Sequence, residues 1–520
     1  MSVGVVRPAR WVLERTLLGV VLAVATAMLG AASAWRPVHD QVLMEYVAFA
    51  HEAFGKLPYR DIFEMNPPGT HLLHLLLFAL VGRNELGLRI VDLTWLLATG
   101  SAVLVYLRPA GLRVGLTAAC LFTIDYLSLG PLHSMQREYL CVLPAALALC
   151  LAFRARGPIA RRTFWIGVLY GVVLTIKPLL AVGVIPVLLA VLHARWRELG
   201  PSPASSRVVT ALGQTLAAGA IGGVLPALGC VLYLASTDSL LPFLRIVRDY
   251  WPLYAQLGGD GSVRAGLLAT STLDGVRSVI GTGTMLALFP VGSYAIATRL
   301  REPELRPEVL TLFATVAAFV AYIALNGKFW EYHGLPLFFA CALIGGFAEW
   351  RPAGKSLATS WLVVRAVLLA AIVWLGLAES PSQKAAAAWH ERVSSGATDV
   401  ARFLAGHMRP GDRVQPLDVA SGAVHAMLLV GAELPTSFLY DFHFYHHTSS
   451  PVIAALRRQM IAEMESSQPR FLIVATQPSF RARGSDSSPF PELQQLIDRD
   501  YAWVYRSHGL EVLERRAASD

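Results

Sequence analysis

Long apolar runs, separated by short arginine-rich segments, dominate this sequence of 520 residues. A helix needs about 20 mainly apolar residues to cross the hydrocarbon core of a bilayer. Of the sequence, 55% is hydrophobic and only 15% is charged, whereas soluble domains carry about 25% charged residues. The chain is therefore predicted to be a polytopic α-helical membrane protein.

The apolar runs and the arginine clusters together predict about 11 to 13 transmembrane helices. The runs lie near residues 16–35, 86–107, 112–130, 138–153, 164–177, 178–193, 208–234, 277–298, 308–326, 334–349 and 357–379. A shorter apolar segment, 68–82, is either a tilted short helix that crosses the membrane or a re-entrant piece that does not. Arginine and lysine are enriched in cytoplasmic loops, which places the N-terminus in the cytoplasm and the segment after the first span outside.

Charge and cysteine usage exclude two other interpretations of the sequence. The net charge of +8 comes from the arginine clusters between apolar runs, so it does not indicate nucleic-acid binding. The five cysteines all lie in hydrophobic segments, so no structural disulfide is expected. The protein is predicted to reside in the inner or plasma membrane as a multi-pass protein.

The character of the chain changes near residue 380. Residues 1–379 are predicted to form the transmembrane domain, with a first external loop at 36–67, and residues 380–520 a small extracytoplasmic α/β domain. Short apolar and alternating segments predict its elements. The expected helices are 398–407 and 491–498, and the expected strands are 470–476, 501–505 and 510–513.

Besides Glu45 and Glu52, the first external loop carries three acidic residues, Asp40, Asp61 and Glu64, in a short space. Between them an amphipathic helix is predicted over 41–54, ending at Gly55. Such a helix next to a span is expected to lie in the membrane interface with its apolar face in lipid or protein. The predicted apolar face consists of Leu43, Tyr46, Val47, Ala50 and Phe54, and the polar face of Gln41, Glu45 and Glu52.

The motifs of this loop resemble a known family. Trp-x-Pro-x-x-Asp at 35–40, Leu-Pro-Tyr-x-Asp at 57–61 and Pro-Pro at 67–68 are similar to the first external loop of the GT-C glycosyltransferases. The nearest branch is the protein O-mannosyltransferase and lipid A aminoarabinose transferase group, and the resemblance is strongest over 35–92. The aminoarabinose branch tends to carry Glu-Lys-Pro-Pro where this chain has Glu-Met-Asn-Pro-Pro at 64–68, so the sugar is left open.

The resemblance implies an inverting glycosyltransferase that moves a hexosyl or pentosyl group from a polyprenyl-phosphate carrier to an acceptor outside the membrane. The acceptor is a lipid, a glycan or a protein. Such a reaction needs a base for the acceptor hydroxyl and cationic groups for the leaving phosphate. Asp40 matches the acidic residue that the family carries after span one and is the predicted base. The alternative is that Asp40 only caps the helix that follows it.

Several further residues are candidates for binding the substrates. Each has a plain structural alternative: Asp61 can pair with Arg60, Lys177 can extend to the headgroups, and aromatic residues are common at membrane interfaces. The candidates are Asp61, Glu64, Arg137, Glu138, Lys177, Lys328, Tyr332 and His333. Arg137, Lys177, Lys328 and His333 are expected on the phosphate and Tyr332 on the prenyl chain.

No metal ligand set can be assigned from the sequence. Some relatives use a divalent cation at the donor phosphate, so a divalent metal ion stays a candidate cofactor without ligands. The segment 441–447 is rich in histidine, but it lacks a zinc-site spacing, and a solvated aromatic surface loop is the favoured interpretation.

The rival function is a transporter or flippase of lipid-linked sugars. Transporters tend to place polar groups near the bilayer midplane and to show repeated halves. In this chain the polar motifs cluster at the predicted outer ends of helices and no second half repeats the first, which favours the transferase.

Overall fold

The computed structural model describes residues 6–200, 203–256, 284–303, 305–327, 330–350, 381–476 and 486–517. By its internal contacts the chain divides into two compact units. We call the described part of 1–35, 90–229 and 263–383 the bundle unit, and the described part of 36–89, 230–262 and 384–520 the sheet unit. The predicted division at residue 379 stays a prediction.

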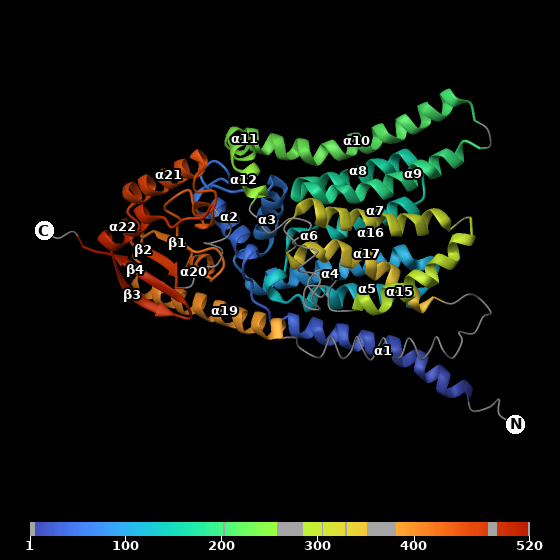
Figure 1. Ribbon diagram of the computed structural model, residues 1–520, viewed down its shortest axis with the longest axis horizontal. Coiled ribbons are helices and arrows are strands. Elements are labelled where there is room, and N and C mark those ends of the chain that lie inside the picture. The colour runs from blue at the N-terminus through green and yellow to red at the C-terminus, as the bar shows by residue number, and fades with distance from the viewer. Residues whose placement is uncertain are drawn as a thin grey trace. The chain divides into compact units, whose positions relative to one another are not determined.

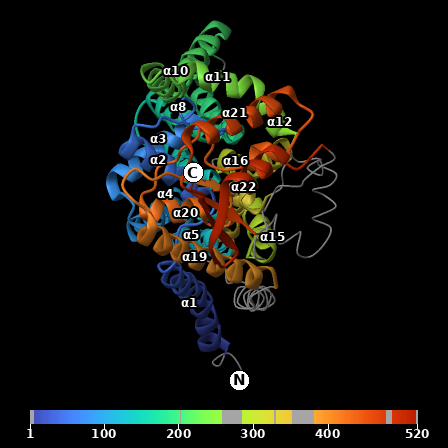
Figure 2. The same cartoon turned by 90° about the vertical axis from the view of Figure 1, so that its left-hand side faces the viewer.

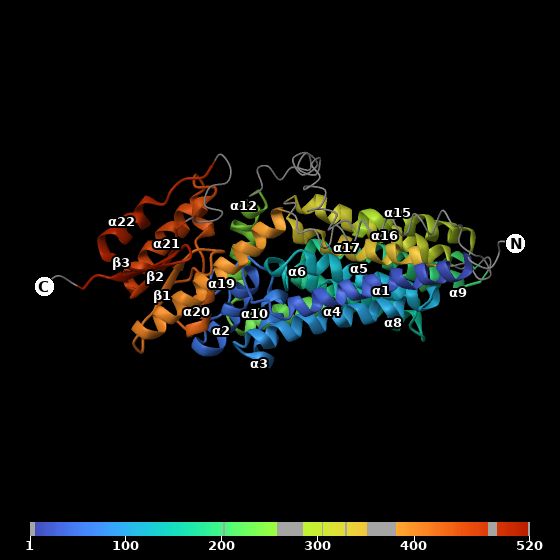
Figure 3. The ribbon, with the colours of Figure 1, turned by 90° about the horizontal axis from the view of Figure 1, so that it is seen from below.

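The bundle unit is built from helices that run side by side (Figures 1 and 3). Helices α4 and α10 each continue from one unit into the other. The elements are α1 (Val6–Ala32), α4 (Glu85–Leu107), η1 (Arg108–Ala110), α5 (Leu112–Ser128), η2 (Pro131–His133), α6 (Arg137–Leu140), α7 (Val142–Phe153), α8 (Ile159–Ile176), η3 (Pro178–Gly183), α9 (Val184–Glu198), α10 (Ser205–Ser236), α15 (Thr284–Ala297), η4 (Thr298–Arg301), α16 (Arg306–Asn326), η5 (Glu331–Gly334), α17 (Leu335–Gly346) and η6 (Phe347–Glu349).

Five helices in the described ranges are long and apolar enough to cross a membrane. They are Glu85–Ala110, Ile159–Ile176, Pro178–Glu198, Ser205–Ser236 and Arg306–Asn326, and two shorter apolar helices are Leu18–Ala32 and Pro68–Val81. The chain is a multi-pass membrane protein, as its apolar runs predict. The predicted span 357–379 and residues 277–283 of another lie outside the described residues, so the total of 11 to 13 spans stays a prediction. The orientation of the termini also stays a prediction.

Helices α8 and α10 approach each other closely at glycines. A Cβ atom at Gly222 would lie 2.0 Å from the carbonyl oxygen of Phe164, and one at Gly167 would lie 2.1 Å from that of Gly219. Helices in a membrane gain little from burying apolar surface, so small residues that allow close backbone packing drive their association. At Gly213, also in α10, an added Cβ would meet nothing within 4 Å.

Gly222→Ala should therefore destabilise the bundle unit, whereas Gly213→Ala should not. The methyl group at residue 222 would force the two backbones apart, at a cost of about 1–3 kcal/mol. At residue 213 alanine only improves helix propensity. Thermal unfolding of the two purified variants measures the difference. Equal melting temperatures would show that the α8–α10 contact does not depend on glycine.

The sheet unit contains a four-stranded sheet in the order β1-β2-β4-β3. Strands β1 and β2 are parallel, and β2–β4 and β4–β3 are antiparallel. The elements are α2 (Asp40–Phe54), α3 (Pro68–Val81), α11 (Leu240–Asp249), α12 (Trp251–Ala255), α19 (Pro381–His407), β1 (Val414–Leu417), α20 (Ala423–Val430), η7 (Phe442–Tyr445), α21 (Pro451–Ser467), β2 (Phe471–Ala475), α22 (Pro491–Asp500), β3 (Tyr501–Ser507) and β4 (Leu510–Arg515).

Helices cover both faces of this sheet, with α21 and α22 on one face and α19 and α20 on the other (Figures 1 and 2). Alternate residues of β2 enter two different cores: Phe471 and Ile473 pack with α19, α20 and α2, and Leu472 packs with α21 and α22. The predicted strands 470–476, 501–505 and 510–513 are confirmed, and so is the helix 491–498. Helix α19 begins well before the predicted residue 398.

The amphipathic helix of the first loop is present as α2, and Gly55 ends it in the left-handed conformation with φ 66°. Its predicted polar face is confirmed at Glu52, which is exposed, but is wrong at two other residues. Gln41 and Glu45 are buried, while Phe54 of the predicted apolar face is exposed. The reason is that α2 joins the core of the sheet unit, where residues on most of its circumference meet α3 and α20. Helix α2 is therefore held by protein around most of its first ten residues.

Candidate functional site

Three side chains converge on one carboxylate oxygen in the bundle unit. Lys177 Nζ lies 2.8 Å from Glu138 Oε1 and the Tyr322 hydroxyl donates to the same oxygen at 2.7 Å. His333 Nε2 lies 3.4 Å from it. The Glu138 and His333 side chains are almost completely buried, and Lys177 is 14% exposed. We call Glu138, Lys177, Tyr322 and His333 the Glu138 cluster.

Local sequence explains how each member reaches this cluster. Lys177 ends α8 because Pro178 follows it, and its backbone leaves the helical region at φ −145° and ψ 88°. Because α8 ends at this point, the Lys177 ammonium group can extend beyond the end of the helix. Glu138 lies in the first turn of α6, and His333 lies in η5, directly before α17. Three of the sequence-predicted candidates, Glu138, Lys177 and His333, are thus brought together.

A buried aspartate fixes the segment that leads to Glu138. The Tyr126 hydroxyl donates to Asp92 Oδ1 at 2.6 Å, and the Ser134 hydroxyl donates to Oδ2 at 3.0 Å. The Tyr126 ring stacks on Tyr139 at 3.9 Å with an interplanar angle of 3°. Met135, between these residues, has φ 56°. The bonds to Asp92 hold this strained turn, which directs the chain into α6.

A second contact joins the two turns that carry Glu138 and His333. His133 Nε2 lies 2.9 Å from Glu331 Oε2. The hydrogen bond from His133 lowers the pKa of the Glu331 carboxyl more than partial burial raises it. Tyr332 is buried, with its ring 5.7 Å from that of His133, and its expected contact with a prenyl chain stays a prediction. Lys328 lies outside the described residues.

Asp40 occupies the first position of α2 in the sheet unit. The N-cap is His39, with φ 55°, and it makes no side-chain capping bond. The alternative that Asp40 is the N-cap is therefore wrong. His39 Nδ1 lies 3.1 Å from Asp40 Oδ1, and the Asp40 side chain is 27% exposed. Its role as the base stays a prediction.

The two acidic residues that follow α2 in the first loop hold its turns. Asp61 pairs with Arg60 at 2.8 Å and accepts a hydrogen bond from the Leu57 amide at 2.9 Å. Burial raises the pKa of the Asp61 carboxyl, but these bonds outweigh it and the net pKa is lowered. Glu64 is fully buried and its Oε1 accepts bonds from the Met65 amide at 2.8 Å and the Asn66 amide at 2.9 Å. The contacts support structural roles, and substrate binding by either residue stays a prediction.

The histidine-rich segment 441–447 is not a solvated loop, and that interpretation is wrong. His443 is buried and its Nδ1 lies 2.8 Å from the Tyr250 hydroxyl. Its ring contacts those of Phe63 at 4.7 Å and Tyr440 at 4.8 Å. The segment belongs to the core of the sheet unit, because Phe63 and Tyr250 from distant parts of the chain pack against the imidazole.

Stability of the sheet unit should fall as the pH falls below about 6.5. Burial, followed by the charge of nearby His446, lowers the pKa of the His443 imidazole to about 3. Between these values the unfolded chain binds the proton and the folded chain does not, so stability decreases by about 1.4 kcal/mol per pH unit. Thermal unfolding of wild type and His443→Gln at pH 7 and pH 5 measures this. The same slope in both proteins would contradict it.

Two groups of paired polar residues in the sheet unit, one buried and one partly exposed, were not predicted from the sequence. His74 Nδ1 lies 2.9 Å from Glu45 Oε1, with both side chains buried. Glu85 accepts from Arg36 Nε at 2.9 Å and lies 2.6 Å from His425 Nε2. A histidine in the apolar segment 68–82 was a usable signal for the first pair, since buried polar groups need partners. His425 lies too far along the chain from Glu85 for any local pattern to pair them.

The described residues offer no ready metal site. No group of three or more His, Cys, Asp or Glu side chains in these ranges could hold a metal ion. In the Glu138 cluster the carboxylate faces a lysine, which competes with a cation for the same oxygen. No reaction step is therefore assigned to a metal, and a divalent cofactor stays a prediction.

Two solved structures align with nearly the whole chain. ArnT from Cupriavidus metallidurans bound to undecaprenyl phosphate aligns over 96% of this chain and 98% of its own, with a TM-score of 0.60 and 14% sequence identity. The apo form of the same protein aligns over 98% of both chains, with a TM-score of 0.55 and 13% identity. The chain has the GT-C fold. No protein-family model matches the sequence, and no curated protein matches it significantly.

The GT-C fold agrees with the prediction made from the motifs at 35–40, 57–61 and 67–68. The alignment extends far beyond the segment 35–92 that carries these motifs. Because sequence identity is low, the likeness establishes the architecture: a helical membrane protein with a small C-terminal sheet.

Proposed function

We propose that this protein is an inverting glycosyltransferase that moves a sugar from a polyprenyl-phosphate carrier to an acceptor on the outer side of the membrane. The observation that carries the proposal is the convergence of Glu138, Lys177 and His333 from three distant segments of a chain with the GT-C fold. The ArnT structure that aligns with this chain has undecaprenyl phosphate bound, which supports a lipid phosphate as the donor.

In the proposed reaction Asp40 removes the proton from the acceptor hydroxyl. The acceptor oxygen forms a bond to the anomeric carbon, and the bond from that carbon to the phosphate oxygen breaks. The electron pair leaves with the polyprenyl phosphate, and a single displacement of this kind inverts the anomeric configuration. Lys177 and His333 offset the charge that develops on the phosphate.

The geometry refines the role of Glu138. Its carboxylate is fully buried and one of its oxygens is contacted by Lys177, Tyr322 and His333. A buried carboxylate so placed orients the cationic groups, and we assign it that role rather than a contact with the substrates. Arg137, next to it in α6, remains a candidate for the phosphate.

Glycan analysis of envelope fractions from a strain that lacks the gene tests the proposal. We expect one sugar to disappear from an envelope component and the polyprenyl-phosphate sugar to accumulate on the outer leaflet. Wild-type protein should restore the sugar, and Lys177→Met should not. Accumulation of the carrier on the inner leaflet alone would contradict the proposal and support a flippase. An unchanged glycan profile would contradict both functions.

A further inference from the structure

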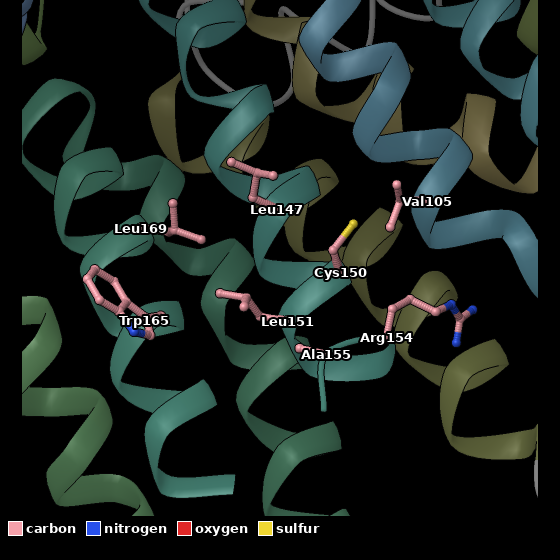
Figure 4. A pocket seen from close by; sticks show the side chains of 8 residues that line it. All are labelled: Val105, Leu147, Cys150, Leu151, Arg154, Ala155, Trp165 and Leu169. Carbon is pink, nitrogen blue, oxygen red and sulfur yellow. The ribbon is translucent and has the colours of Figure 1, made fainter. Parts of the chain in front are cut away.

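A groove of about 440 Å³ opens on the surface of the bundle unit (Figure 4). It is lined by α4, α7 and α8, chiefly through Val105, Leu147, Leu151, Trp165 and Leu169. Val105 and Trp165 are about half exposed. An exposed apolar surface on membrane-crossing helices faces lipid, and a groove of this size is large enough for a bound ligand. The lining can hold a hydrocarbon chain and offers it few polar partners.

One end of the groove is cationic. On α8, Arg161, Trp165 and Leu169 are spaced by four residues, so they lie on one helix face and Arg161 continues the line of the groove. The other wall ends at Ala155, and Arg156 follows it. Both Arg156 and Arg161 are exposed. The apolar groove thus leads directly to two arginines.

Two neighbouring arginines are engaged within the protein. Arg154 Nε donates to the Tyr106 carbonyl at 2.6 Å, and its guanidinium forms an ion pair with Glu308. Arg162 Nη1 donates to the Ala155 carbonyl at 3.0 Å. These bonds fix the turn between α7 and α8. The backbone that carries Arg156 and Arg161 is therefore held in place by these bonds.

This cationic end is remote from the Glu138 cluster. Arg154 follows Glu138 by 16 residues along α6 and α7, which corresponds to about 24 Å at 1.5 Å per residue. The hydrocarbon core of a bilayer is about 30 Å thick. The arginines and the Glu138 cluster consequently lie near opposite surfaces of the membrane, so the groove is separate from the proposed transfer site.

We propose that the groove binds an acyl chain of an anionic phospholipid from the leaflet opposite the Glu138 cluster. The phosphate of the headgroup contacts Arg156 and Arg161, and the chain lies along Trp165 and Leu169. Basic pockets between membrane helices are known to hold anionic headgroups, and each basic residue near the surface contributes a factor of about 5 in affinity. The site takes an anionic phospholipid of the bilayer, and does not depend on the proposed transferase activity.

Trp165 is a built-in reporter for this site. Purified full-length protein is titrated with phosphatidylglycerol or phosphatidylcholine that carries brominated acyl chains, which quench tryptophan on contact. The difference in quenching between wild type and Trp165→Phe measures lipid bound next to Trp165 in the groove. We expect half-maximal quenching at a concentration of phosphatidylglycerol at least about 5-fold lower than that of phosphatidylcholine.

Removing both arginines should abolish this preference. Arg156→Gln with Arg161→Gln is expected to raise the half-maximal concentration of phosphatidylglycerol by about 25-fold. Arg207→Gln, at an exposed arginine in the first turn of α10, is the matched control and should have no effect. Val105→Phe, which narrows the groove at a half-exposed residue, should weaken quenching by both lipids.

Three results would overturn the proposal. Equal quenching by the two phospholipids would show an unspecific lipid contact. An unchanged titration in the double arginine variant, with its melting temperature retained, would show that the arginines do not bind the headgroup. Displacement of brominated phosphatidylglycerol by an equal or lower concentration of undecaprenyl phosphate would identify the groove as a site for polyprenyl lipid instead.

Discussion

Replacing Asp40 with asparagine should lower the rate of sugar transfer by about 10³-fold, the range of a lost general base. Asparagine has nearly the same size and cannot accept the proton of the acceptor hydroxyl. The loss of one negative charge in the first turn of α2 costs at most about 1 kcal/mol of helix stability. The variant should therefore fold, bind its lipid donor and fail in the chemical step.

The measurement compares kcat of wild type and Asp40→Asn, with the acceptor and the polyprenyl-phosphate sugar identified from the deletion strain. Asp61→Asn is the matched control, because Asp61 is an acid of the same loop that bonds to Arg60 and to the Leu57 amide. We expect that variant to lose some thermal stability and to keep most of its transfer rate. Transfer by Asp40→Asn at the wild-type rate would remove Asp40 from the mechanism.

Sequence alone located the elements whose causes are local. The limits of α2 follow from the amphipathic pattern and from Gly55, which adopts a positive φ at low cost. The break at Lys177 follows from Pro178, which cannot continue a helix. Strand β2 was identified as a short apolar run. In each of these cases a few neighbouring residues determine the backbone.

The burial of α2 against residues 423–434 could not be predicted, because these partners lie hundreds of residues away. The Tyr46 hydroxyl donates to the Ala432 carbonyl at 2.8 Å, and Met427 and Leu434 belong to the same core. A polar residue such as Glu45 looks like a solvent-facing residue until its partner, His74, is known. Tertiary contacts of this kind override the apparent amphipathic pattern.

The residues of the candidate site also divide into those that the sequence identifies and those that depend on distant contacts. An ionisable residue within an apolar region is a functional candidate on general grounds, and this argument selected Lys177, whereas Glu138 and His333 were selected from the resemblance to the GT-C family. The same argument applied to Asp92 would have found the residue that holds the turn before α6. Tyr322 could not be found, since a tyrosine near the end of an apolar helix is common and its partner is 184 residues away.

Neutralising Glu138 should destabilise the bundle unit by about 3–5 kcal/mol, which exceeds the cost expected for Gly222→Ala. In Glu138→Gln the amide keeps the shape of the side chain, but Lys177 retains its charge beside a buried neutral group. His333 also loses its anionic neighbour. Folded protein should be recovered in lower yield and unfold at a lower temperature, and donor binding should weaken because the cationic groups lose their orientation.

A second variant separates the charge imbalance from simple loss of packing. Replacing a buried ion pair by apolar residues of similar volume is often neutral in stability, so Glu138→Leu with Lys177→Met should recover most of the melting temperature lost in Glu138→Gln. Transfer should stay abolished in that double variant, since the Lys177 ammonium group no longer offsets the phosphate charge. If the double variant were as unstable as the single one, the unpaired charge of Lys177 would not be the source of the stability lost in Glu138→Gln. If it were stable and active, the cluster would serve folding only, and the phosphate would have to be neutralised by other residues.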